Sequence, residues 1–560
     1  MKKYFNTDIT IEHVNEEVTL YGWIANKRKF KKQHFIDLRD RSGLIQVILF
    51  DVTDPKLTKE SSIKVTGIVK ERLEYNTELK TGQIEIHVTD YEVLNSASQL
   101  PFEIMKEDSA NEDLRLEYRF LDLRSEKMQY NIALRHKVNM ETRKFFDKNG
   151  FLEIETPILC KSTPEGARDF LVPTRRNGKF FALPQSPQLY KQLLMASGYE
   201  KYFQIARVFR DEDLRKDRQP EFTQIDFEMS FADREDLFAL VENYYKHIWN
   251  SLGMELKTPF PRMGFFESMD KYGNDKPDTR FENLLTNVKV FDQSIHTHKS
   301  IAFENIELIS KKDILFELGF KNNAENMTVV EFENSKMKSK VFKGIQLTDE
   351  YINEIIAAQK LISGSIIISL GEYDNVVKSL GALRTFIAEE YALTNPNQFN
   401  FVWIVDWPMF EYNKETNEYE PAHHAFTRPD LETLKYIETN EYDKVRACSY
   451  DIVLNGFELG SGSVRNHDAE MQQKIFEYLK MSPKEYNDKF GFFLNAFKYG
   501  LPPHLGMAFG LERILMIISN SKSIRDVIAF PKNAKGLDLL SKSPSNVTEF
   551  QLDEYGLKLK

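Results

Sequence analysis

The segment from Tyr202 to Phe231 combines strand-like alternation with charged side chains that could bind a polar ligand. Apolar residues alternate at both of its ends and a run of charges separates them, which predicts an antiparallel hairpin with a long loop. Burying polar side chains on a sheet face is costly unless a partner satisfies them. An arginine can bind a phosphate through two nitrogens, and a neighbouring carboxylate can accept from an amino group of a base. A solvated hairpin is the alternative, but a ligand on the sheet would explain why the segment contains Arg210, Glu212, Gln224, Asp226 and Glu228.

Two acidic residues far along the chain, Asp451 and Glu458, could together bind a divalent cation. Carboxylates are the oxygen donors that Mg²⁺ prefers in proteins, alongside water and phosphates. Seven residues apart, the two side chains would face opposite sides of one straight strand, so we expect a bend at Asn455-Gly456 to bring them together. As isolated acids they would only face solvent, which is the alternative.

The adjacent histidines His423 and His424 suggest another metal site, but their pattern does not support one. Neighbouring residues of a strand point to opposite faces, and no cysteine or third ligand is spaced to complete zinc coordination. The two cysteines, Cys160 and Cys448, are far apart and have no CxxC spacing. We therefore expect neither a disulfide framework nor zinc.

Length and composition limit the class of protein. A chain of 560 residues is too long for one hydrophobic core and predicts about three or four domains of roughly 100 to 200 residues each. Its start has no signal-peptide core and no apolar run is long enough to span a bilayer, so we expect a cytoplasmic protein without a membrane segment. The net charge of −10 argues against an overall nucleic-acid coat, although a local basic surface can still bind RNA.

The first hundred residues predict a small β-barrel. Between its first two strands lies a basic run from Lys27 to Lys32, which we expect in a loop. A solvated loop is the ordinary interpretation, but a basic rim beside an aromatic on such a barrel can hold single-stranded nucleic acid. A Greek-key barrel of the OB type is indicated by the short β-like runs Val18 to Ala25, His34 to Leu38, Leu44 to Phe50, Ile63 to Val69 and Ile84 to Val93.

Two helices are predicted before the hairpin. One is long and ends at Asn149-Gly150, where glycine suits a left-handed cap. The other begins near Ser186-Pro187. On the second helix, Gln188 and Lys191 share a face because they are three residues apart.

Several runs of residues resemble the class II aminoacyl-tRNA synthetases, and among them the aspartyl-tRNA synthetases of bacterial type. FRDE at 209–212 with DRQPEFTQID at 217–226 resembles motif 2 of the class, and GMAFGLER at 506–513 resembles motif 3. TPEGARD at 163–169 resembles the loop that closes over the amino acid, and FIDLRDRSGLIQV at 35–47 resembles the anticodon-binding barrel. Small departures from the family are Gln83, Ala425 and Glu512, where glutamate, proline and aspartate are usual.

The resemblance implies an α+β fold, with an N-terminal OB-fold β-barrel and a class II catalytic domain built on an antiparallel sheet. Region 281–397 is expected to be an inserted α+β domain with a strand at Ser365 to Leu370 and a helix at Val376 to Glu390, and we assign it no chemistry. Motif 1, the long helix and the strand expected at 151–159, implies a homodimer. The expected boundaries are a barrel at 1–96, a hinge at 97–113, the first catalytic part at 114–280, the insertion at 281–397, and the second catalytic part with a C-terminal extension at 398–560.

The resemblance also implies site residues for an enzyme that activates L-aspartate with ATP and Mg²⁺ and transfers it to tRNA(Asp). Catalysis would depend on Arg210, Glu458 and Arg513, and the metal ligands would be Asp451 and Glu458. Aspartate would contact Glu165, Gln188, Lys191, Arg210, Asp226, His423, His424 and Arg465. ATP would contact Arg210, Asp211, Glu212, Gln219, Glu458, Gly510, Leu511, Glu512 and Arg513.

On the barrel, the resemblance implies that Phe35 stacks on an anticodon base, although without it Phe35 would be a core aromatic. The other implied anticodon contacts are Arg28, Gln46, Arg72 and Glu85. Asparaginyl- and lysyl-tRNA synthetases share the barrel and the catalytic fold, and a non-catalytic RNA-binding paralogue is the alternative of a different class. The sequence leaves open whether tRNA(Asn) is also charged.

Overall fold

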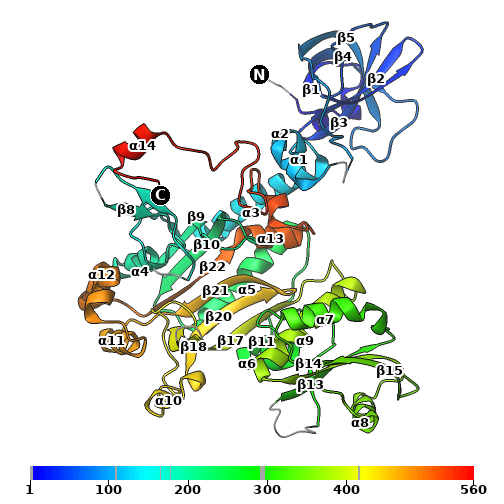
Figure 1. Ribbon diagram of the computed structural model, residues 1–560. Coiled ribbons are helices and arrows are strands. Elements are labelled where there is room, and N and C mark those ends of the chain that lie inside the picture. The colour runs from blue at the N-terminus through cyan, green and yellow to red at the C-terminus, as the bar shows by residue number, and fades with distance from the viewer. Residues whose placement is uncertain are drawn as a thin grey trace. The chain divides into compact units, whose positions relative to one another are not determined.

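The computed structural model describes residues 4–106, 110–163, 166–176, 178–289, 297–413 and 417–559 (Figure 1). Contacts divide the chain into two compact units, and each is described by itself. The first unit comprises Met1–Leu134 and Arg525–Asn546. The second comprises Arg135–Ile524 and Val547–Lys560.

The first unit contains the predicted OB-fold barrel. Its strands close in the order β1-β2-β3-β5-β4, and alternate residues such as Leu20, Ile36 and Val65 fill the interior and are fully buried. This barrel confirms the expected fold, which rests on period-2 burial of one strand face. The strands are β1 (Glu17–Phe30), β2 (Gln33–Asp40), β3 (Gly43–Phe50), β4 (Ser62–Glu71) and β5 (Ile84–Asn95).

The basic run of the barrel was expected in a loop, and that expectation is wrong. Strand β1 continues through it and pairs with β2 as far as Phe30 opposite Gln33. Only Lys31 and Lys32 form the turn, with Lys31 at a positive φ of 53°. The positive charges therefore project from a paired β-ribbon, which fixes their spacing.

Short helices follow the barrel in the same unit: α1 (Glu112–Glu117), α2 (Arg119–Asp122) and the start of α3 (Glu126–Lys148). The buried guanidinium of Arg119 donates to the backbone oxygens of Arg525, Ile528 and Ala529. These bonds tie the C-terminal segment of the unit to its helices.

The second unit is built on a large mixed sheet whose described strands follow the order β11-β17-β20-β21-β22-β10-β9-β6. Strands β9 and β10 form the predicted hairpin and pair from Lys201–Met229 to Phe209–Glu221. Neighbours are antiparallel except the outer pairs β11/β17 and β6/β9. The bounds are β6 (Leu152–Glu153), β9 (Lys201–Phe209), β10 (Glu221–Ser230), β11 (Arg262–Gly264), β17 (Phe401–Pro408), β20 (Arg446–Leu454), β21 (Phe457–Val464) and β22 (His504–Gly510).

Alternation along β10 separates the two faces of this sheet. Phe227 packs with Phe146 of α3 and with Phe509 of β22, and Phe509 stacks on Tyr244 of α5 (Arg234–Ser251). Ile225 and Phe227 are fully buried on this helix-covered face. The even-numbered residues Gln224 and Asp226 therefore point to the opposite face, because successive side chains of a strand alternate.

The remaining elements of the unit lie around the sheet. Helix α3 ends at Lys148 and Gly150 has the left-handed φ of 78° that was predicted for its cap. The strand expected at 151–159 is only β6. The other elements are β7 (Leu171–Pro173), β8 (Phe180–Ala182), α4 (Gln188–Ala196), α6 (Phe265–Tyr272), β18 (Phe410–Asn413), β19 (Glu418–Pro421), α10 (Lys435–Glu438), α11 (Ala469–Tyr478), α12 (Pro483–Leu494), α13 (Leu511–Ile518) and α14 (Glu549–Glu554).

The inserted region folds as a second, smaller sheet of order β12-β13-β16-β14-β15. Helices α7 and α9 pack on one face, where Leu315 and Leu380 join Ile367 in one apolar cluster. Helix α8 covers the other face, where Ile352 packs with Ile366 and Ile368 (Figure 1). The bounds are β12 (Thr286–Asn287), β13 (Thr297–Glu304), α7 (Lys312–Lys321), β14 (Asn326–Glu333), β15 (Lys336–Lys343), α8 (Asp349–Gln359), β16 (Gly364–Gly371) and α9 (Tyr373–Glu390).

Candidate active site

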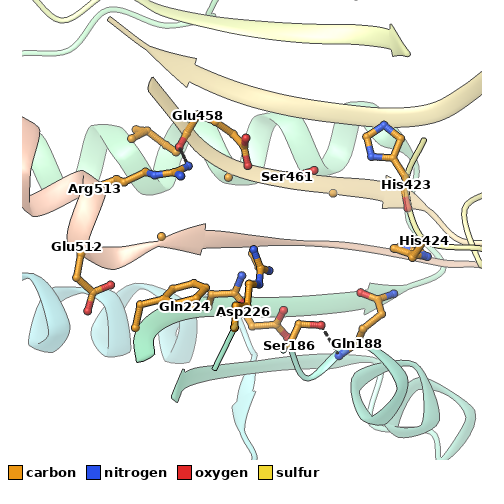
Figure 2. A pocket seen from close by; sticks show the side chains of 18 of the residues that line it. Ser186, Gln188, Gln224, Asp226, His423, His424, Glu458, Ser461, Glu512 and Arg513 are labelled. Carbon is orange, nitrogen blue, oxygen red and sulfur yellow. Dashed lines mark hydrogen bonds between the residues drawn. The ribbon is translucent and has the colours of Figure 1, made fainter. Parts of the chain in front are cut away.

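A polar pocket of about 280 Å³ lies on the open face of the large sheet. Figure 2 shows Glu512 and Arg513 toward one end of it and Gln188, His423 and His424 toward the other. The predicted site residues that line it are Gln188, Lys191, Arg210, Glu212, Gln219, Asp226, His423, His424, Glu458, Arg465, Gly510, Glu512 and Arg513.

The other predicted residues lie elsewhere. Asp211 pairs through its backbone with Arg168, and Leu511 is fully buried in the core; neither lines the pocket. Asp451 is buried and does not line the pocket, although its strand neighbour Ser461 does. Glu165 lies outside the described residues.

One end of the pocket holds two buried cations paired with two buried carboxylates. Lys191 Nζ donates to Asp226 Oδ2 at 2.7 Å and lies 3.3 Å from Glu228 Oε2. Arg465 donates through Nε to Glu228 Oε1 at 2.8 Å and through Nη2 to Oε2 at 3.0 Å. Each of these side chains is at most 2% exposed. The group is thus electrically balanced before any ligand enters.

Burial and pairing shift the two carboxyl groups in opposite directions. Burial raises the pKa of Asp226 to about 6, although Lys191 lowers it. Burial also raises the pKa of Glu228, but Arg465 and Lys191 outweigh burial and leave it below its usual value. At neutral pH both groups are therefore ionised.

The cations keep donors for a ligand. A guanidinium has five N–H donors, and Arg465 gives two to Glu228 and, through Nη1, one each to Ser463 Oγ and His424 Nε2. One of its donors, and one of the three on Lys191, have no partner among the described residues. A carboxylate entering the pocket could accept both.

Neutral histidines surround these charges. Burial lowers the pKa of His423 to about 4, and burial followed by the charge of Arg465 lowers the pKa of His424 well below its ordinary value. Both lie in a loop after β19 and not in a strand, so both can line the pocket, contrary to the expectation that they face opposite ways. They add hydrogen-bonding groups without adding charge.

Several buried polar atoms around the pocket have no partner within the described residues, among them Gln188 Nε2, Gln224 Oε1, Asp226 Oδ1 and His423 Nε2. Buried polar groups in native proteins are normally hydrogen-bonded. Unsatisfied atoms that line a pocket therefore point to a polar ligand.

The other end of the pocket is rich in arginine. Arg513 Nη1 donates to the backbone oxygen of Glu458 at 2.8 Å, and its Nη2 lies 3.3 Å from Asp217 Oδ2. Arg210 lies over the ring of Phe222, with 5.2 Å from its guanidinium carbon to the ring centroid. Arg218 pairs with Glu212 at 2.9 Å. Guanidinium groups in such a cleft suit phosphate and the face of a planar base.

Glu512 has a positioning role in this arrangement. Its Oε1 accepts from Arg135 Nη2 of α3 at 2.8 Å, and its Oε2 accepts from the backbone N–H of Thr223 in β10 at 3.0 Å. The carboxylate of Glu512 thereby links α13 to α3 and to β10. The glutamate side chain is long enough to reach both partners.

Asp451 and Glu458 stand on either side of the predicted bend. Asn455 and Gly456 have positive φ values of 53° and 87° and form the turn between β20 and β21. Burial and the charge of Glu458 raise the pKa of Asp451 well above its ordinary value, and Asp451 Oδ1 has no partner within the described residues. Two interacting carboxylates with an unsatisfied oxygen fit a divalent cation that takes its remaining ligands from water and phosphate.

The described residues contain no group of three or more potential metal ligands. A cation lies beside the carboxylate pair, because Lys276 Nζ is 3.5 Å from Glu458 Oε2. Burial raises the pKa of Glu458, but Lys276, Arg513 and Arg210 outweigh it and lower the pKa below its usual value.

Sequence reasoning named Glu228 among the polar residues of the hairpin without giving it a partner, and it assigned no role to Ser463 or Lys276. For Glu228 a signal existed, because it follows Gln224 and Asp226 at period 2 on one strand face. The same period of two applies to Ser463, which lies two residues before Arg465 and therefore on the same face. Lys276 had none, since it belongs to a loop whose path depends on distant contacts.

The barrel places its predicted residues on neighbouring strands. In the register, Arg28 is opposite Phe35 and Gln46 is opposite Glu85. Gln46 Nε2 donates to Glu85 Oε2 at 2.8 Å, and Arg72 Nη2 donates to Gln46 Oε1 at 3.4 Å. Phe35 is half-buried and lies outside the barrel's core cluster, so part of its side chain is exposed.

No helix in the described ranges has the length and apolar character that a bilayer span requires.

Residues 111–534 match the family model described as tRNA synthetases class II (D, K and N), and residues 18–94 match the OB-fold nucleic acid binding domain.

Relatives of similar length share much of the sequence. The chain is 45% identical to Aspartate–tRNA ligase of Malacoplasma penetrans, over 98% of this chain and 97% of that protein. It is 43% identical to Aspartate–tRNA(Asp/Asn) ligase of Bacillus subtilis, over 100% of this chain and 99% of that protein. The fold is similar to the crystal structure of asparaginyl-tRNA synthetase from Pyrococcus horikoshii complexed with asparaginyl-adenylate, with a TM-score of 0.60 at 19% identity, over 95% of this chain and 98% of that one.

A family match across most of the chain, full-length relatives and a pocket on the open face of the sheet agree, and the chain belongs to the class II tRNA synthetases of the D, K and N group.

Proposed function

We propose that the protein is an aspartate–tRNA ligase, which activates L-aspartate with ATP and transfers it to tRNA(Asp). The observation that carries this proposal is the pair of buried cations, Lys191 and Arg465, each with a donor to spare at one end of a pocket whose other end is rich in arginine. The names of the full-length relatives support the same activity.

Specificity follows from donors, because the charges are already balanced. A carboxylate can accept from both Lys191 and Arg465, whereas the amide NH₂ of asparagine would place a donor against a donor. A site built around such hydrogen bonds can reject the wrong analogue by about 10⁴-fold. Asp226 holds Lys191 in place and Glu228 holds Arg465, and Gln188 and His423 offer unsatisfied nitrogens to the substrate.

In the activation step, the α-carboxylate of aspartate attacks the α-phosphorus of ATP and pyrophosphate leaves. Arg210 and Arg513 would neutralise charge on the phosphates, with Glu212, Gln219 and the backbone at Gly510 around the nucleotide. Mg²⁺, held by Asp451 and Glu458, would supply further charge neutralisation on the phosphates. The residues thus act by positioning and electrostatics, with no covalent intermediate on the protein. The 3′-terminal hydroxyl of the tRNA then attacks the aspartyl carbonyl.

The barrel would read the anticodon of tRNA(Asp) through Arg28, Phe35, Gln46, Arg72 and Glu85. A homodimer through motif 1 and a cytoplasmic location are part of the same proposal. Closure of the loop that carries Glu165 over the amino acid is also proposed on the resemblance alone.

The proposal is tested by ATP–pyrophosphate exchange with each of the twenty amino acids, with and without Mg²⁺. Exchange with aspartate that chelation abolishes is expected. Exchange with asparagine or lysine in its place would mean that Lys191 and Arg465 do not bind a carboxylate side chain, and no exchange at all would favour the RNA-binding paralogue. Charging of tRNA(Asp) and tRNA(Asn) then defines the acceptor.

A further inference from the structure

Lys276 lies beside Glu458, one of the two proposed metal ligands, but comes from outside the large sheet. It belongs to the segment 274–283, which leaves α6 and leads into the inserted domain. Its Nζ bonds Asp275 at 2.6 Å and lies 3.5 Å from Glu458 Oε2. The side chain is 32% exposed, and its ammonium contacts the carboxylates of Asp275 and Glu458.

The inserted domain holds this segment through one arginine. Arg384 of α9 is 2% exposed and donates to the backbone oxygens of Asn283 at 2.5 Å, Phe281 at 2.9 Å and Asp278 at 3.1 Å. Its guanidinium carbon also lies 3.7 Å from the centroid of the Phe281 ring. Arg384 thus holds the segment through three backbone carbonyls and one aromatic ring, because its guanidinium group is planar and rigid.

A second contact fixes the start of the segment. Gly273, at a φ of 66°, meets Gly381 of α9 so closely that a Cβ built on Gly381 would lie 2.3 Å from the oxygen of Gly273. Below 3.0 Å such a contact forces the backbone to move. The glycine pair therefore sets where the chain turns toward Lys276.

The opposite side of the segment rests on the hairpin that carries the metal ligands. Asn400 donates to the oxygen of Thr279 at 3.0 Å and, through its backbone N–H, to Asn455 in the β20–β21 turn at 2.9 Å. Asn274 Oδ1 accepts from the backbone N–H of Lys276 at 2.8 Å. The segment is thus a rigid link between α9 and the turn that separates Asp451 from Glu458.

We propose that the inserted domain, through Arg384, holds Lys276 against Glu458 as a tethered cation that competes with the divalent ion for the Asp451–Glu458 pair and so sets the affinity of the site. This inference rests on the proposed metal site. In the absence of metal, the ammonium neutralises part of the carboxylate pair. When the ion binds, the ammonium of Lys276 must move away from Glu458. The rigidity of the segment 274–283 determines the free-energy cost of that movement.

The test is to measure Mn²⁺ binding without ATP, using the paramagnetic signal of the free ion. The proteins compared are the wild type, Lys276→Met, Arg384→Met and the double variant. Lys276→Met is expected to bind Mn²⁺ about tenfold more tightly, since a unit charge a few ångströms from a divalent ion has roughly that effect even in a water-like dielectric. Arg384→Met should give part of that gain, and should add nothing in the Lys276→Met background if it acts through Lys276. Unchanged or weaker binding by Lys276→Met, or full additivity in the double variant, would overturn the inference.

A backbone change at Gly381 tests the same link independently. Such a second variant is needed because Arg384→Met could unfold the inserted domain. Gly381→Ala should also tighten Mn²⁺ binding by displacing the segment. Gly491→Ala is its matched control, since a Cβ at that helical glycine meets no atom nearer than 3.8 Å, and it should leave Mn²⁺ binding unchanged. No difference between the two variants, both folded by circular dichroism, would count against the link.

Failure of this inference can be told from failure of the metal site. Glu458→Gln should abolish specific Mn²⁺ binding if the site exists. If Glu458→Gln binds as the wild type does, the metal site itself is wrong. If Glu458→Gln loses binding while Lys276→Met equals the wild type, only the competing role of Lys276 is wrong.

Discussion

Replacing Arg465 with methionine tests the amino-acid end of the pocket most directly. Methionine keeps the apolar stem of the side chain but removes two bonds to Glu228, one to Ser463 and one to His424. Glu228 is 0% exposed and would keep only Lys191, at 3.3 Å. Four balanced charges then become three, with one buried negative charge in excess.

Two magnitudes follow for this variant. Breaking a buried ion pair by removing one partner costs about 3–5 kcal/mol, so the melting temperature should fall by several degrees. For the substrate, losing a hydrogen bond to a charged group costs about 1.5–3 kcal/mol, or roughly 10- to 150-fold in kcat/KM for aspartate at about 1.4 kcal/mol per tenfold. This is a lower bound, because the unpaired Glu228 would also repel the substrate carboxylate.

A double variant separates stability from binding. Adding Glu228→Gln to Arg465→Met restores the charge balance, because Lys191 and Asp226 remain paired at 2.7 Å. Melting temperature should recover in part, whereas aspartate-dependent pyrophosphate exchange should stay low and the KM for ATP should change little throughout. Normal aspartate kinetics in Arg465→Met, or recovery of activation together with stability in the double variant, would refute the assignment of Arg465 as a substrate ligand.

Three other predictions concern separate parts of the chain. Acidification from pH 7 to pH 5 should lower the melting temperature, because burial lowers the pKa of His504 to about 4 while histidine in the unfolded chain takes up a proton near its ordinary pKa of 6.5; His504→Asn should lose less over the same interval. Glu85→Gln, which weakens the bond to Gln46, should reduce aminoacylation of tRNA(Asp) about 10-fold or more, a change of at least about 1.4 kcal/mol, and leave pyrophosphate exchange unchanged. Glu512→Gln should lower the melting temperature and raise the KM for ATP, since the bond to Arg135 loses its charge, and normal values for both would contradict a positioning role.

The elements that carry chemistry could be predicted because their local patterns are strong. Alternation on both sides of a charged loop gave the β9–β10 hairpin, and the dipeptide Asn455-Gly456 gave the turn between Asp451 and Glu458. The same alternation identified Glu228 as a polar residue on that face, but not its partner Arg465, which lies far along the chain. In each case the signal lies within a few residues of the side chain it positions.

The inserted domain was predicted only in part. Its central strand β16 and helix α9 confirm the strand expected at Ser365 to Leu370 and the helix expected at Val376 to Glu390, because a fully buried strand shows a continuous apolar run. The edge strand β15 is lysine-rich and half exposed, and nothing marks it as part of a sheet until its partner is known. The place of Lys276 depends on Arg384, more than a hundred residues later in the chain, and no local pattern encodes such a contact.

The two ends of the pocket manage charge in different ways, and strand geometry explains the difference. At the amino-acid end, β10 presents Asp226 and Glu228 on one face, and each finds a buried cation, so binding there is decided by which donors remain. At the end where we propose a metal site, a hairpin turn brings two carboxylates together near Lys276, which is shared with Asp275, and we expect charge to decide binding there. Aspartate and asparagine have nearly the same size, and a neutral cluster with spare donors can distinguish them without leaving an unpaired buried charge when the pocket is empty.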